Sequence, residues 1–187
     1  MQGIKAGVRV DNDNGAVDVD ELNIFDYANT TGRNVVIDSV SVYLDGYAIT
    51  YNKCYAKMYG GSGVNDFRVD HTSNYGTYLW AGVNTLSRVR VLGTGGPVTV
   101  DGFETATIGD PVEGLKWIEG NVTLVNASDS PVDLTVDNGN ESGTNHYVTI
   151  TDEEMWGFAR DSFPGNISYR NSPLRSLKVI GGNGNRP

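Results

Sequence analysis

The chain contains a single cysteine, Cys54, and only two histidines among its 187 residues. One cysteine excludes an internal disulfide, and so few Cys and His residues leave little for a zinc site. No apolar run approaches the roughly 18 residues that cross a bilayer as a helix, and the first residues, MQGIKAGVRV, lack the apolar core of a signal peptide. We therefore expect a soluble protein without cofactor or metal, which folds where it is made and does not insert into a membrane.

Basic residues are also scarce. Lys and Arg together number 14 against 23 Asp and Glu, which gives a formal net charge of -9. This charge argues against nucleic acid as a partner, because phosphate contacts need a basic surface. Most of the acidity comes from aspartate, with 16 Asp against 7 Glu, a bias that resembles haloarchaeal proteins. The alternative is that acidic loops occur on any β protein.

If the aspartate bias is halophilic, the melting temperature should rise between low and molar potassium chloride. The physical reason is that screening relieves the repulsion among unpaired surface carboxylates. Thermal unfolding across a series of salt concentrations measures the effect. A flat or falling curve would remove the main support for a haloarchaeal source.

Strand patterns run through most of the chain and are clearest between Leu115 and Val136. Successive residues of 122–125 and of 132–136 alternate in character, with the period of two that half-buried strands show. The residues between them, 126–131, are of the types that favour a turn and include a proline. The sequence therefore predicts an antiparallel hairpin here.

About ten short strands and their turn signals fill the chain, with no fixed-period repeat and no interdomain linker. This layout predicts one all-β domain over residues 1–187, a two-sheet antiparallel sandwich of the single jelly-roll type. An immunoglobulin-like sandwich is the alternative, but it would leave strands over. A capping box at Thr151–Glu154 predicts one short helix through Met155–Arg160 near the C-terminus. Residues 181–187 are expected to form a flexible tail.

Tyrosine and lysine gather on one face of the strand predicted over Ile49–Tyr59. Small residues alternate there with a second set that should face outward, namely Tyr51, Lys53, Tyr55, Lys57 and Tyr59. Tyrosine supplies large, stiff, amphipathic area at interfaces. We therefore predict a protein interface on this face. Cross-strand aromatic pairs on a solvated sheet are the alternative interpretation.

Motifs of a catalytic site are missing. The chain has no Gly-x-Ser-x-Gly elbow to anchor a hydrolase triad, and its carboxylates are too abundant for the sequence to select a glycosidase pair. Gly93–Pro97 lacks the lysine and the following helix that a phosphate-binding loop requires. We predict that the protein is not an enzyme and has no catalytic residues.

In size, composition and strand layout the chain resembles the smaller major capsid protein of tailless icosahedral haloarchaeal viruses with an internal membrane, the sphaerolipovirus-like group. The resemblance covers the whole chain and rests on no diagnostic motif. It implies a single upright jelly roll in the virion, made in the host cytoplasm. Such a protein assembles with itself and with a larger sister capsid protein, close to the internal viral membrane. The face from Tyr51 to Tyr59 would then make lateral contacts.

A second interpretation is a carbohydrate- or receptor-binding β-sandwich module of the kind found at phage tail tips. Tyr75, Tyr78 and Trp80 lie close together in an aromatic stretch and would stack on sugar rings. Assembly on a sizing column and binding on a glycan array separate the two interpretations.

Overall fold

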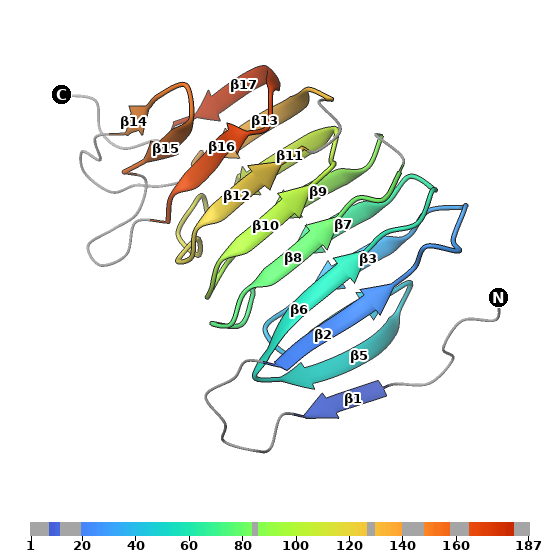
Figure 1. The fold of residues 1–187 in the computed structure, drawn as a ribbon. Helices are drawn as coiled ribbons and strands as arrows, with labels where there is room; N and C mark the ends of the chain where they lie inside the picture. The colour runs from blue at the N-terminus through green and yellow to red at the C-terminus, as the bar shows by residue number, and fades with distance from the viewer. Residues whose placement is uncertain are drawn as a thin grey trace.

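The computed structural model describes residues 8–11, 20–83, 86–126, 130–139, 148–157 and 165–181. The regular structure of these residues is entirely β and forms two facing sheets (Figure 1). Sheet A has the spatial order β1 (Val8–Asp11), β5 (Tyr47–Asn52), β4 (Ser41–Leu44), β3 (Asn34–Ile37), β7 (Asp66–Val69), β9 (Arg88–Val91), β11 (Thr105–Gly109), β13 (Val132–Asp137) and β17 (Leu174–Ile180). Sheet B has the order β14 (Thr149–Ile150), β15 (Glu154–Trp156), β16 (Ile167–Asn171), β12 (Val122–Val125), β10 (Val98–Asp101), β8 (Thr77–Trp80), β6 (Cys54–Tyr59) and β2 (Asp20–Phe25).

Through the middle of the molecule, consecutive strands alternate between the two sheets. β6 lies in sheet B and β7 in sheet A, and β8 then returns to sheet B beside β6. Neighbouring strands are parallel from β2 through β12 to β16 in sheet B, and from β3 through β13 to β17 in sheet A. The chain therefore winds as a parallel solenoid, in which each turn adds one strand to each sheet (Figure 1).

Antiparallel strands extend the sheets at both ends of this solenoid. In sheet A, β3, β4 and β5 pair antiparallel, and β1 then adds in parallel to β5. In sheet B, β14, β15 and β16 pair antiparallel at the opposite end. The solenoid proper therefore lies between two short antiparallel extensions.

The prediction of an all-β, two-sheet protein is confirmed, but the antiparallel jelly roll is wrong. β12 and β13, predicted as the two arms of a hairpin, lie in different sheets and do not pair with each other. Each pairs in parallel with the strands of the turns before and after it. Residues 127–129 of the predicted turn lie outside the described residues. The residues on either side of them lie at a corner of the solenoid, where the chain passes from β12 in sheet B to β13 in sheet A. The turns differ in length, which explains why no fixed-period repeat is visible.

The prediction of a helix after Thr151 is also wrong, because its first residues, Met155 and Trp156, lie in strand β15. The amides of Glu153 and Glu154 do donate to Thr151 Oγ1, at 3.2 and 3.1 Å, as in a helix cap. The amide of Thr151, however, donates to the carbonyl of Glu154 at 2.9 Å, which closes the hairpin between β14 and β15. The chain continues from that turn as strand β15. Residues 158–164, with the end of the predicted helix, and 182–187, with most of the predicted tail, lie outside the described residues.

The core fills the space between the sheets with rows of side chains from successive turns. Met58, Leu79 and Val100 are register partners across β6, β8 and β10, and all three are buried. Phe67 of β7 projects inward from the other sheet and meets Phe103 edge-on, with ring centroids 5.2 Å apart. Each such buried side chain contributes about 1.5–3 kcal/mol, so the parallel rows supply much of the stability.

One buried asparagine holds a corner of the solenoid together. Asn65 Nδ2 donates to the carbonyls of Ala81 at 2.9 Å and Gly63 at 3.0 Å, and its Oδ1 accepts from the amide of Arg33 at 3.0 Å. Arg33 precedes β3, Asn65 precedes β7 and Ala81 follows β8, so this one side chain joins three turns. Backbones pack closely beside it, since a Cβ on Gly61 would lie 2.1 Å from a backbone carbonyl oxygen.

Candidate functional site

The outer face of sheet B is the most distinctive surface of the molecule. In β6, Cys54, Ala56 and Met58 are buried, while the alternating Tyr55, Lys57 and Tyr59 point outward and are half-buried. Parallel strands in register place outward residues of neighbouring strands side by side. Tyr59 thus lies between Phe25 of β2 and Trp80 of β8.

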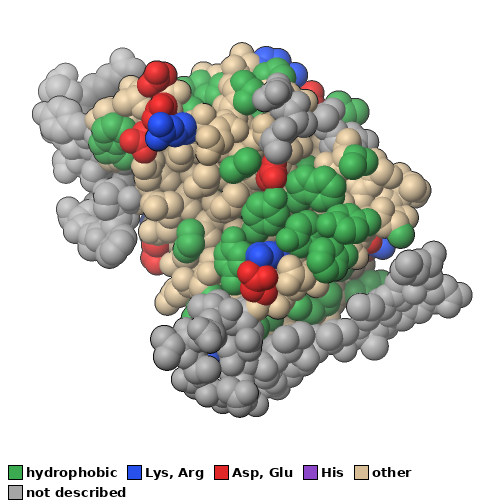
Figure 2. Space-filling model, in the orientation of Figure 1, with side chains coloured by type: hydrophobic (Ala, Val, Ile, Leu, Met, Phe, Trp, Pro, Cys, Tyr) green, Lys and Arg blue, Asp and Glu red, His purple; other side chains and the backbone are tan. Residues whose placement is uncertain are grey.

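Six aromatic side chains gather on this face, and we call them the aromatic patch. Five of the rings contact one another, and the ring of Tyr55 contacts Lys57, whose Nζ lies 5.4 Å from the ring centroid. The rings of Phe25 and Tyr59 stack with centroids 4.8 Å apart, those of Tyr27 and Trp80 meet edge-on at 5.7 Å, and those of Tyr59 and Tyr78 are tilted at 5.8 Å. Its members are Phe25, Tyr27, Tyr55, Tyr59, Tyr78 and Trp80. Figure 2 shows it as an apolar area over β2, β6 and β8.

The aromatic patch is open to solvent. Phe25 is 59 % exposed and Tyr27 56 % exposed, and the other four rings are half-buried. Single exposed apolar residues are common on proteins, but a contiguous apolar patch marks a contact site for a partner or ligand. The patch is therefore the leading candidate for function.

Polar groups sit among the rings and are already paired. Lys57 Nζ bonds Glu21 Oε1 at 2.6 Å, which lowers the pKa of Glu21 and raises that of Lys57. The hydroxyl of Tyr78 donates to Asp101 Oδ2 at 2.7 Å. Burial raises the pKa of Tyr78, with the Asp101 hydrogen bond adding to the effect, and burial also raises the pKa of Tyr55. Both phenols stay neutral at physiological pH, and the one proton of Tyr78 is used in its bond to Asp101.

The five residues predicted as one interface face do not share a face. The predicted strand breaks at Lys53, which has a φ of 55°, so that β5 lies in sheet A and β6 in sheet B. Tyr51 is only 3 % exposed and donates its hydroxyl to the carbonyl of Asp38 at 2.7 Å, so it belongs to the core. Tyr55, Lys57 and Tyr59 do lie together on the outer face.

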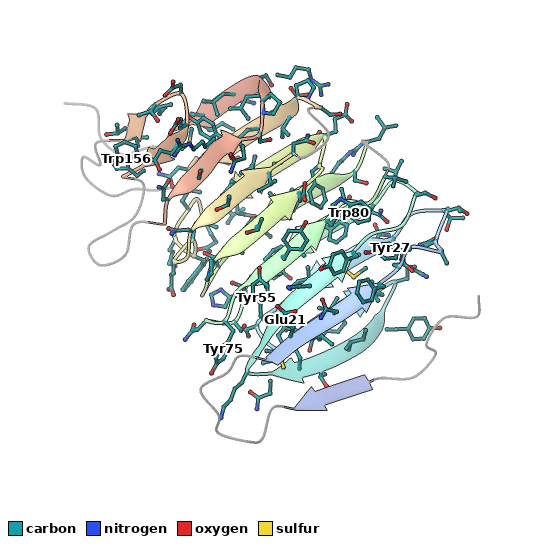
Figure 3. All side chains as sticks on the ribbon, viewed as in Figure 1. Glu21, Tyr27, Tyr55, Tyr75, Trp80 and Trp156 are labelled. Atoms are coloured by element: carbon teal, nitrogen blue, oxygen red, sulfur yellow. The ribbon has the colours of Figure 1, made fainter. Side chains whose placement is uncertain are left out.

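Two of the three residues predicted to stack on sugars lie together in the aromatic patch, and Tyr75 lies apart, at the other end of β8 from Trp80 (Figure 3). Tyr78 and Trp80 alternate outward along β8 within the aromatic patch. Tyr75 is exposed in the loop before β8. In Figure 3, Tyr27, Trp80, Tyr55 and Glu21 lie over sheet B, and Tyr75 is near its lower edge. The predicted sites did not include Phe25 and Tyr27, although these residues continue the outward alternation of β2 past Glu21.

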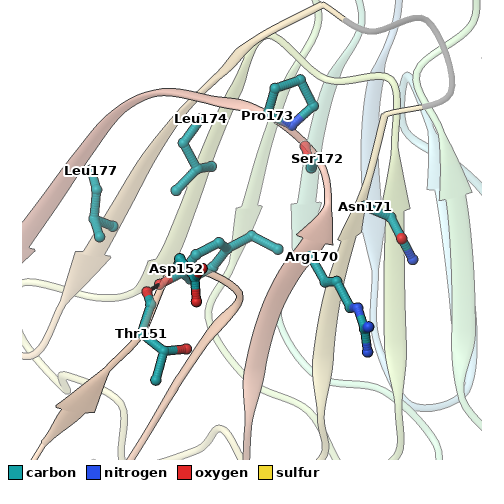
Figure 4. A pocket seen from close by; sticks show the side chains of 9 residues that line it. Thr151, Asp152, Arg170, Asn171, Ser172, Pro173, Leu174 and Leu177 are labelled. Atoms are coloured by element: carbon teal, nitrogen blue, oxygen red, sulfur yellow. Dashed lines mark hydrogen bonds between the residues drawn. The ribbon is translucent and has the colours of Figure 1, made fainter.

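A pocket lies near the C-terminal end of the solenoid (Figure 4). This pocket has a volume of about 670 Å³ and is lined by residues of the β14–β15 turn, β16 and β17, including Asp152, Arg170 and Leu177. Two of its polar side chains are paired, and the buried hydroxyl of Ser172 has no hydrogen-bond partner among the described residues. The hydroxyl of Tyr169 donates to the carbonyl of Thr151 at 2.6 Å, and Arg170 pairs with Glu153 at 3.4 Å. The aromatic patch is the stronger candidate because it presents exposed rings in mutual contact.

Metal ligands do not gather in the part of the chain that the structure describes, where no group of three or more His, Cys, Asp or Glu side chains is found. His71 is half-buried in the loop after β7, and His146 lies outside the described residues. The described residues also contain no helix of the length and apolarity needed to cross a membrane.

Comparison of the chain with models of protein families, with curated proteins and with solved structures finds no match. Arguments about function therefore rest on the surface itself.

Proposed function

We propose that the protein binds carbohydrate through the aromatic patch. The observation that carries this proposal is the patch of outward rings, five of them in mutual contact, with polar groups set among them. A pyranose ring has an apolar C–H face and a rim of hydroxyls, so it is complementary to a ring face bordered by polar groups. Aromatic rings give such contacts large area at low cost in side-chain entropy.

The proposed activity is binding without catalysis. A glycosidase needs one carboxylic acid with a raised pKa and a second carboxylate across the bond that is cleaved. The pKa of Glu21 is instead lowered by its hydrogen bond to Lys57. Two further carboxylates lie beside the patch: Asp101 accepts the hydroxyl of Tyr78, and Asp26 pairs with Arg33 at 2.8 Å. All three carboxylates are already paired and are poorly placed to act as an acid.

A role as a capsid protein is the competing proposal for the same surface. In that case the aromatic patch would be covered by a second copy of the chain or by a sister capsid protein. The jelly roll that the resemblance implied is replaced by a parallel solenoid, and no contact among the described residues favours assembly over sugar binding. Carbohydrate binding is therefore the function that we put forward.

Trp80→Ala tests the proposal. A glycan array identifies a ligand for the native protein, and calorimetry then measures the affinity of each variant. We expect Trp80→Ala to lose about 2 kcal/mol of binding free energy, roughly thirtyfold in affinity, because Trp80 is a half-buried anchor in the cluster. Trp80→Phe should retain much of the affinity.

Trp117→Ala is the matched control, since Trp117 is exposed outside the strands and contacts Lys116. It should bind like the native protein. Circular dichroism confirms that each variant is folded. The proposal fails if no glycan binds, or if Trp80→Ala binds as well as Trp117→Ala. Self-association on a sizing column that Trp80→Ala abolishes would favour the capsid proposal instead.

A further inference from the structure

The aromatic patch covers only one end of the outer face of sheet B. The register continues the row of Lys57 and Tyr78 to Thr99 of β10, Thr123 of β12 and Ser168 of β16. We call the last three the hydroxyl row. In Figure 2 this part of the face lacks the apolar colouring seen over β2, β6 and β8. One face thus carries aromatic rings at one end and a line of hydroxyls at the other.

The hydroxyl row is available to a ligand. Thr99, Thr123 and Ser168 are all half-buried. Within the part of the chain that the structure describes, their side chains take part in no hydrogen bond. Hydroxyl groups that face outward without protein partners retain both their donor and their acceptor capacity. Three of them in register offer a repeating set of hydrogen bonds along the solenoid.

We propose that the aromatic patch and the hydroxyl row together bind one extended glycan chain that runs across the strands, along the solenoid axis. This inference rests on the proposed function and specifies its ligand. Neighbouring strands are about 4.8 Å apart, which is close to the length that one pyranose unit adds to an extended chain. Successive sugars would therefore meet successive strands, first the rings of β6 and β8 and then the hydroxyls of β10, β12 and β16.

The charges on this face indicate an uncharged glycan. Lys57 is the cation within the row, and it is neutralised by Glu21 at 2.6 Å. Asp101 borders the track beside Thr99, and Glu154 is the register partner of Ser168 in β15. Arg170, which follows Ser168 on the outward side of β16, pairs with Glu153 at 3.4 Å. An acidic glycan would bring its carboxylates or sulfates towards Asp101 and Glu154 with no unpaired cation among the described residues of this face to offset the repulsion.

The test is the dependence of affinity on chain length. The probes are uncharged homo-oligosaccharides of glucose, mannose, galactose and xylose, each from dimer to hexamer, with oligogalacturonate as the acidic comparison. For the series that binds, the native protein should bind the hexamer at least tenfold more tightly than the dimer. The triple variant Thr99→Val, Thr123→Val, Ser168→Ala should lose about tenfold for the hexamer and keep its affinity for the dimer, since each hydrogen bond contributes modestly.

Thr107→Val with Thr135→Val is the matched control. These threonines are half-buried register partners on the outer face of sheet A, and their replacement should leave the length dependence intact. Equal affinity for dimer and hexamer, or equal loss of both in the triple variant, would overturn the axial track while leaving sugar binding at Trp80 in place. Preference for oligogalacturonate would overturn the uncharged class. Failure of every oligosaccharide to bind would overturn the proposed function as well.

Discussion

Phe67→Ala should lower the free energy of unfolding by about 3–5 kcal/mol, the range found when a buried phenylalanine is truncated. Phe67 has an exposure of 0 % and lies inward on β7. Its ring meets Phe103 edge-on, so truncation removes this contact and leaves a cavity between the two sheets. The interior of a parallel stack has little freedom to collapse, because the strands on both sides are fixed by their own hydrogen bonds.

Chemical denaturation of the native and variant proteins measures the loss. Phe25→Ala makes the same chemical change on the outer face, where the ring is 59 % exposed, and it should cost less than about 1 kcal/mol. A similar loss from both variants would contradict the assignment of an inward and an outward face. Phe25→Ala should instead weaken ligand binding, which separates the two roles of phenylalanine in this fold.

Asn65→Ala should be of comparable severity, with a loss of about 3 kcal/mol or more. The carboxamide is 1 % exposed and bonds the backbone of Arg33, Gly63 and Ala81. Alanine would leave these groups without their partner in a site that excludes water. Each buried group so orphaned costs about 1–3 kcal/mol, although a water molecule that enters the space would recover part of it.

Thermal and denaturant unfolding of Asn65→Ala provide the measurement. Asn52→Ala is the control, because Asn52 is an exposed residue at the end of β5, and its replacement should change stability by within about 0.5 kcal/mol. Equal stability of the two variants would show that the corner is held by backbone contacts alone. A selective loss in Asn65→Ala would establish the side chain as a link between turns.

The positions of the strands could be read from the sequence, but their partners could not. Alternation such as that of Val122–Val125 identifies a strand with one buried face, whichever strand lies beside it. Parallel pairing joins Val122 to Val98, residues in different turns, and no local signal records this. Corners rich in Asn, Asp and Gly use the residue types that also make hairpin turns, so the sequence predicts a hairpin where the chain turns a corner after Val125.

The candidate site was predicted in part, for a related reason. Tyr55, Lys57 and Tyr59 were placed correctly on one face because they fall within a single strand. The prediction for Tyr51 is wrong because the strand ends at Lys53 in a left-handed backbone conformation that is unusual for a lysine, and no neighbouring residue signals a break there. Phe25, Tyr59 and Trp80 come from three separate turns of the solenoid. Their positions side by side follow from the register between strands, which the sequence does not show.

The winding of the chain also determines how such a protein can change in size. Each turn of the solenoid bonds mainly to the turn before it and the turn after it, as in other repetitive stacks. Insertion or removal of a whole turn would leave the remaining contacts in place and would lengthen or shorten both outer faces by one strand. The number of turns therefore sets the length of the two outer faces, and a chain of this architecture with more or fewer turns would present a longer or shorter binding surface.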